Sequence, residues 1–144
     1  MHEPEALARA ANALDDGRLE LGVGTGGDWQ GFDSWVDALV AVTGEIPLTV
    51  GGAGETALRV AARHASRWNY SPAREDSREN ARRKGRELNA RLNEVADRPI
   101  LRSALIAYPF TAEDDTPFDE VVAAWAEAGF EELIFDDGRL TGQG

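Results

Sequence analysis

Hydrophobic residues recur along the chain with two periods, one typical of helices and one typical of strands. The helical spacing i, i+3, i+4, i+7 alternates with short runs in which every second residue is apolar. The first pattern predicts helices over residues 7–14, 32–43, 55–65, 72–96 and 118–128. The second predicts strands over residues 19–23, 47–50, 67–70, 100–108 and 132–136.

This regular alternation predicts an α/β fold with parallel strands and covering helices. An open doubly wound sheet and a (β/α)8 barrel both fit the order of elements. A complete barrel takes about 250 residues, whereas this chain has 144 residues. The length therefore predicts a single domain over residues 1–144 with about five strands.

Local signals place the starts of two helices and their buried stripes. Ser71 followed by Pro72 is typical of an N-cap and a first helical position, so we expect the long helix to begin there. Thr116 and Pro117 predict the start of the last helix. Its buried stripe is expected to contain Phe118, Val121, Val122 and Trp125.

A glycine-rich turn is the strongest candidate site in the sequence. Pro47 begins a short apolar strand, Gly51, Gly52, Ala53 and Gly54 follow it, and a helix starts at about Glu55. Glycines let a ligand approach the backbone, and the following helix directs its free N–H groups and positive dipole end at the turn. These features predict an anion site, typically for phosphate. An ordinary turn that needs glycine only for its geometry is the alternative.

Composition and charge exclude several classes of function. The net charge of −11 opposes binding to nucleic acid and to anionic membranes. The absence of cysteine removes disulfides and thiolate chemistry, and the two histidines are too far apart to suggest a metal site. The sequence lacks a long apolar run, and its acidic N-terminus does not resemble a signal peptide, so a cytoplasmic protein is expected.

Four segments, taken in order, resemble the luciferase-like monooxygenase family. They are residues 10–26, 35–45, 47–69 and 121–135. The third segment is the most specific, with Val-Gly-Gly-Ala-Gly at residues 50–54 and Trp-Asn at residues 68–69. The resemblance implies a (β/α)8 barrel of which this chain holds about the last five strands, a partial TIM-type barrel. It also implies FMN or a deazaflavin coenzyme as the cofactor.

The resemblance assigns cofactor contacts to seven residues. The glycine turn is similar to the family's contact with the flavin phosphate. The loop that contains Gly24 and Thr25 follows the C-terminal end of a strand, where such barrels bind their ligands. Trp68 is interpreted either as a residue that flanks the isoalloxazine ring or as a residue of the core. The full set is Gly24, Thr25, Gly51, Gly52, Ala53, Gly54 and Trp68. No catalytic residue is carried over, and His64 is interpreted as a structural histidine.

These observations leave more than one function open. The first is a flavin- or deazaflavin-dependent oxidoreductase acting on a small-molecule substrate. The second is a non-catalytic flavin-binding partial barrel that acts as a structural or interaction module, and the third is an unrelated α/β domain that binds a phosphorylated small molecule. A partial barrel also predicts a homodimer, or a partner chain that completes the barrel, driven by an apolar inner face. The candidates for that face are alternating sets, with the register between them left open, of Leu19, Leu21, Val23, Leu48, Val50 and Ile134.

Overall fold

The computed structural model describes residues 3–24, 30–73, 76–108 and 117–137, and helices and strands alternate throughout this part of the chain. The helices are α1 (Pro4–Leu14), α2 (Phe32–Thr43), α3 (Glu55–His64), α4 (Arg78–Val95) and α5 (Phe118–Glu127). The strands are β1 (Leu21–Gly24), β2 (Leu48–Gly51), β3 (Arg67–Tyr70), β4 (Leu101–Tyr108) and β5 (Glu132–Asp137). The predicted order of elements is confirmed.

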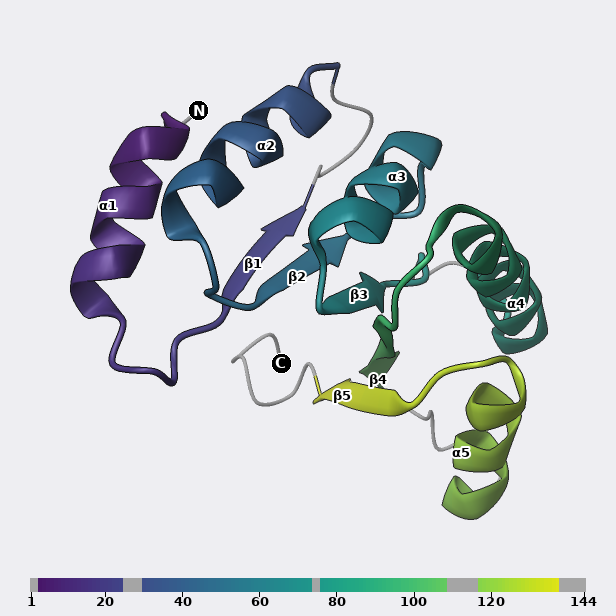
Figure 1. Ribbon diagram of the computed structural model, residues 1–144. Helices are drawn as coiled ribbons and strands as arrows, with labels where there is room; N and C mark the ends of the chain where they lie inside the picture. Colours follow the sequence, from purple (N-terminus) through teal and green to yellow (C-terminus); the bar gives the residue numbers. More distant parts are fainter. Residues whose placement is uncertain (1–2, 25–29, 74–75, 109–116, 138–144) are drawn as a thin grey trace.

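All five strands lie parallel in one sheet, in the order β1-β2-β3-β4-β5. Each strand therefore pairs with the strand that follows it in the sequence, and the helices between them lie in an outer layer around the strands (Figure 1). A doubly wound sheet reverses its strand order and carries helices on both faces. The described part of the chain shows an α/β sheet without such a reversal.

Alternate residues of each strand face the helices and form the core. In β2 these are Leu48 and Val50, and in β3 they are Trp68 and Tyr70, all of them buried. The residues between them, such as Thr49 and Asn69, are only partly buried and point to the opposite side of the sheet. We call this opposite side the inner face.

An aromatic cluster fills the core between the sheet and the helices α4 and α5. The ring of Trp68 stacks with those of Tyr70 and Phe130 at centroid separations of 6.0 and 6.1 Å. Trp125 from α5 meets the ring of Phe130 edge-on. Stacked and edge-on aromatic pairs stabilise a core beyond the area that they bury, so this cluster ties the middle strand to the C-terminal half of the molecule.

The pairing register places most of the candidate inner-face residues on the helix side of the sheet. Leu21 and Val23 pair in register with Leu48 and Val50, so all four side chains lie on the helix side of the sheet. Leu19 precedes β1, and of the predicted set only Ile134 has its side chain on the inner face. The reason is that a period of two defines two faces but does not say which one the helices cover.

Two predictions about the helices are also corrected. Helix α4 begins at Arg78, because the Ser77 hydroxyl accepts the Asn80 N–H at 3.1 Å and so caps the helix six residues after Ser71. In α5, Val121 and Trp125 are buried as predicted, but Phe118 and Val122 are exposed. The ring of Phe118 meets that of Phe135 on the edge strand β5 at a centroid separation of 5.2 Å.

The close approach of α4 to the aromatic cluster generates a stability prediction. A Cβ atom at Gly85 would lie 2.8 Å from Phe130 and 3.1 Å from Tyr70. Gly85→Ala should therefore lower the free energy of unfolding by about 1–3 kcal/mol through overpacking, although alanine is the better helix former. Urea denaturation measures the change. Arg86→Ala, on the exposed side of the same helix, is the control, and a stabilised Gly85→Ala variant would contradict the prediction.

Candidate functional site

The predicted strand, glycine turn and helix are present at residues 48–64. Strand β2 ends at Gly51, and Gly52 has a φ of 131°, in the region that favours glycine. Gly54 precedes α3 with extended backbone and provides no side-chain cap for the first N–H groups of the helix. The turn therefore leaves backbone donors at the N-terminus of α3 for another acceptor.

Trp68 contacts this turn from the helix side of the sheet and does not face a ligand. Its Nε1–H donates to the carbonyl oxygen of Gly52 at 2.8 Å. Its side chain is 0% exposed and lies on the helix side of β3, so the prediction that it flanks a cofactor ring is corrected. The reason is strand alternation, which turns Trp68 into the core and its neighbour Asn69 to the inner face.

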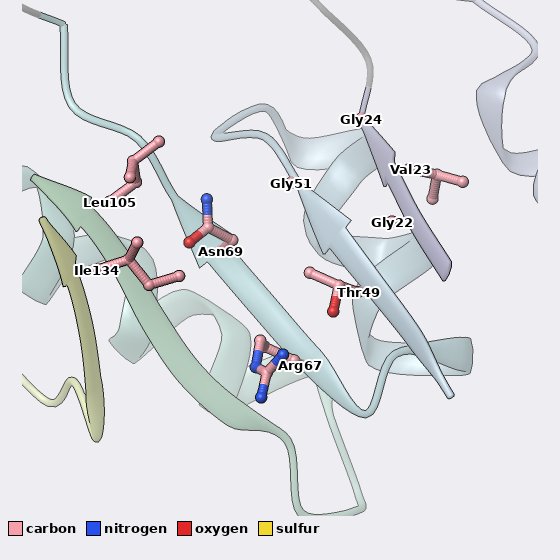
Figure 2. A pocket seen from close by; sticks show the side chains of 9 residues that line it. All are labelled: Gly22, Val23, Gly24, Thr49, Gly51, Arg67, Asn69, Leu105 and Ile134. Carbon is pink, nitrogen blue, oxygen red and sulfur yellow. The ribbon is translucent and has the colours of Figure 1, made fainter. Parts of the chain in front are cut away.

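An open cavity of about 330 Å³ lies on the inner face, beside the ends of β1 and β2 (Figure 2). Its walls come from all five strands: Gly22, Val23, Gly24, Thr49, Gly51, Arg67, Asn69, Leu105 and Ile134. In Figure 2 the side chains of Arg67 and Asn69 lie on the inner face, whereas that of Val23 points away from them. The cavity thus combines bare backbone, polar groups and an apolar side.

Glycines make one wall of the cavity flat. Gly24 pairs in register with Gly51, so two strands meet there without side chains. A Cβ atom at Gly22 would meet nothing within 4 Å, and one at Gly51 would lie 3.8 Å from the Asn69 carbonyl oxygen. Side chains would fill this space, and their absence leaves room for a planar group to lie against the backbone.

Asn69 is the polar side chain at the middle of the cavity. Its Oδ1 accepts the Ser103 hydroxyl at 3.1 Å, and its Nδ2 donates to the Ser71 hydroxyl at 3.2 Å. Ser103 is buried, whereas Ser71 is exposed. The amide is therefore fixed from the interior of the sheet and points its nitrogen toward the accessible end of the strands (Figure 2).

Arg67 closes the opposite end of the inner face. Its Nε lies 3.2 Å from Oε1 of Glu132, and its Nη1 lies 3.8 Å from Oε2 of Glu20. Glu20 immediately precedes β1 and Glu132 belongs to β5. One arginine on the central strand therefore contacts carboxylates from both edges of the sheet. These charges are paired, so Asn69 and Thr49 are the uncharged polar side chains beside the glycines of the cavity.

The charged residue at the start of α3 is also paired. The Nη2 atom of Arg91 lies 2.5 Å from Oε1 of Glu55. This hydrogen bond from Arg91 is the main reason that the pKa of the Glu55 carboxyl is below its usual range. Glu55 is thus ionised at neutral pH and accompanied by a cation, so its charge at the helix N-terminus is partly balanced.

The structure brings together most of the residues that the sequence assigned to the site. Gly51, Gly52 and Gly54 form one turn with the exposed Ala53, and Gly24 lies beside Gly51. Thr25 lies outside the described residues. Sequence reasoning missed the Arg67, Asn69 and Ser103 side chains, although their alternation with apolar residues in β3 and β4 was a signal for the inner face.

The predicted structural role of His64 agrees with its surroundings. Its Nε2 lies 2.6 Å from Oδ1 of Asp37, which joins α3 to α2 on the far side of the sheet from the cavity.

Within the described ranges, three or more side chains suited to metal binding do not converge anywhere. A search of the same ranges finds no helix with the length and apolar character needed to span a membrane. Neither a protein-family model nor a curated protein matches the chain.

The hydrogen bond from Trp68 to the turn generates a second prediction. Trp68→Phe keeps an aromatic ring but removes the donor to the Gly52 carbonyl, which should cost about 1–3 kcal/mol of stability. It should also speed amide hydrogen exchange at residues 51–55, measured by NMR or mass spectrometry. Trp125→Phe, in the same aromatic cluster, should lower stability without this local change. Equal exchange in the two variants would show that the bond does not hold the turn.

Proposed function

We propose that this chain binds a phosphorylated flavin-type cofactor, FMN or a deazaflavin, and serves as a flavin-dependent oxidoreductase domain. One observation carries the proposal: the flat wall formed by the backbone of Gly24 and Gly51, here called the glycine wall, adjoins the glycine turn that precedes α3. A ligand with a planar ring and a phosphate needs both features side by side. The sequence resemblance to luciferase-like monooxygenases points to the same cofactors.

The turn supplies the properties that a phosphate group requires. The N-terminus of α3 has free N–H groups and the positive end of the helix dipole, and Gly54 leaves them uncapped. A Cβ atom at Gly54 would meet nothing within 4 Å, so the space above the turn is open to a ligand. The pairing of Glu55 with Arg91 reduces the repulsion between that carboxylate and a bound phosphate.

The inner face supplies the properties that a planar ring requires. The backbone of Gly24 and Gly51 offers a flat wall, and the apolar side chains of Leu105 and Ile134 line the cavity on the strands β4 and β5. Sites for cofactors are commonly mostly apolar with a few placed polar groups. When bound, the cofactor supplies the redox chemistry, and this chain's residues bind it, orient it and exclude water from one side.

The arrangement of the sheet favours part of a (β/α)8 barrel as the scaffold. The strand order without reversal and the single outer helix layer are typical of a barrel segment. Both the cavity and the glycine turn lie toward the C-terminal ends of the strands, the edge at which barrel enzymes bind their ligands. A homodimer, or a partner chain that completes the barrel, would cover the edges at β1 and β5.

A non-catalytic cofactor-binding module is the second candidate function. The observation that favours it is the paired state of the charged side chains on the inner face, where Arg67 contacts both Glu20 and Glu132. A general acid or base must be free to exchange a proton with its ligand. Measurements of binding and of turnover, made separately, distinguish the two candidates.

Gly54→Asp tests the phosphate site without disturbing the fold. Aspartate is a better N-cap than glycine by a few tenths of a kcal/mol, so thermal stability should be equal or slightly higher. Its carboxylate should compete with the phosphate for the same N–H groups. We expect the affinity for FMN, measured by fluorescence titration, to fall about tenfold, equivalent to about 1.4 kcal/mol.

Two controls make this result specific. Riboflavin, which lacks the phosphate, should bind Gly54→Asp and the unchanged protein alike. Ser77→Asp adds the same charge at the N-cap of α4 and should leave FMN affinity unchanged. If the unchanged protein does not bind FMN, or if Gly54→Asp binds FMN as well as before, the proposed phosphate site is wrong.

The open strand edges predict the behaviour of the isolated chain. Phe118, which contacts the edge strand β5, and Ile134, which belongs to it, are 57% and 45% exposed. Exposed edges and apolar surface promote association. Sedimentation at micromolar concentration should therefore detect dimers.

Because water reaches the inner face, purified protein should reoxidise reduced FMN at close to the rate of free FMN. Turnover well above that rate would contradict this expectation and would support an active site that is completed within the dimer.

A further inference from the structure

The amide of Asn69 lies where it can form a hydrogen bond with the edge of a ring that packs against the glycine wall. It lies on β3, and its register partner on β2 is Gly51, which has no side chain to cover it. Asn69 is partly buried and lines the inner-face cavity with Gly24 and Gly51. A planar ligand against the two glycines would therefore present its edge to the Asn69 side chain.

The hydrogen bonds of Asn69 determine which of its groups faces the ligand. The buried Ser103 hydroxyl donates to Oδ1, so the carbonyl side of the amide is held within the sheet. Of the described residues, only Ser71 accepts from Nδ2, and it takes one of two N–H groups. The remaining N–H is available to an acceptor on a ligand in the cavity that Asn69 lines.

We infer that Asn69 orients the cofactor by donating its Nδ2–H to a carbonyl oxygen on the pyrimidine edge of the ring, and that Ser103 is the positioning residue that fixes the amide. The inference rests on the proposed function. Flavins and deazaflavins share this edge, so one donor serves both. Asn69 lies on the order of 10 Å from the N-terminus of α3, given the spacing of strands and residues, a length that a phosphorylated sugar-alcohol chain spans.

The pattern of affinities for FMN and riboflavin tests the role of Asn69. Asn69→Asp replaces the N–H donor with a carboxylate oxygen that repels the ring carbonyl. The affinity for both ligands, measured by fluorescence titration, should fall by the same factor of about tenfold or more. Asn69→Ala, which adds no charge, should weaken both ligands by a smaller equal factor. Asn12→Asp makes the same substitution on α1, far from the inner face, and should change neither affinity.

The role of Ser103 is tested by the carbonyl stretching frequency of the bound ligand, which does not change when a substitution only lowers the stability of the protein. A hydrogen bond to a ring carbonyl lowers its stretching frequency, so Raman spectra of bound riboflavin should show a lowered band in the unchanged protein. The band should return toward its free value in Asn69→Ala and shift partway in Ser103→Ala. Ser103→Thr keeps the hydroxyl and should restore the lowered frequency.

The outcomes separate this inference from the proposed function. If FMN binds and Gly54→Asp weakens it, but Asn69→Asp and Asn69→Ala bind both ligands unchanged, Asn69 does not contact the ring and the inference fails alone. A loss confined to FMN would place Asn69 near the phosphate and overturn the inference as well. If the unchanged protein binds neither FMN nor riboflavin, both the inference and the proposed function fail.

Discussion

The hydrogen bond from Trp68 to the Gly52 carbonyl joins the core of this protein to its candidate site. The indole ring is packed among Tyr70 and Phe130 on the helix side of the sheet, and its single polar atom reaches the turn between β2 and α3. A turn that contains several glycines has few contacts of its own and much conformational freedom to lose. One buried donor therefore holds the backbone of a flexible sequence in a defined shape, between the cavity wall at the end of β2 and the N-terminus of α3.

Much of the fold could be predicted from the sequence because helices and strands bury their apolar residues with different periods. The alternation of elements, the glycine turn and the strand at residues 67–70 all agree with the structure. The start of α4 was predicted wrongly at Ser71 and Pro72, because a residue type alone does not determine which serine caps a helix. The choice depends on which hydroxyl meets an N–H in three dimensions, and that is Ser77.

The candidate site was predicted only where it depends on backbone. The glycines were recognisable because their residue type limits what the chain does locally, whereas the side chains of the inner face depend on which side of the sheet the helices cover. In β3 the pair Trp68 and Tyr70 faces the core, and the pair Arg67 and Asn69 faces the cavity. In each strand, the polar residues of the alternating pattern indicate the inner face, because the layer of helices covers the apolar residues.

The position of Arg67 has a consequence for one end of the inner face. Its guanidinium contacts Glu20 near β1 and Glu132 on β5 while its backbone belongs to the central strand. A guanidinium presents donors along more than one edge, whereas an ammonium group is a single compact charge. Three side chains together thus span this end of the inner face, from the residue before the first strand to the last strand, so the cavity is bounded there by charged groups that already have partners.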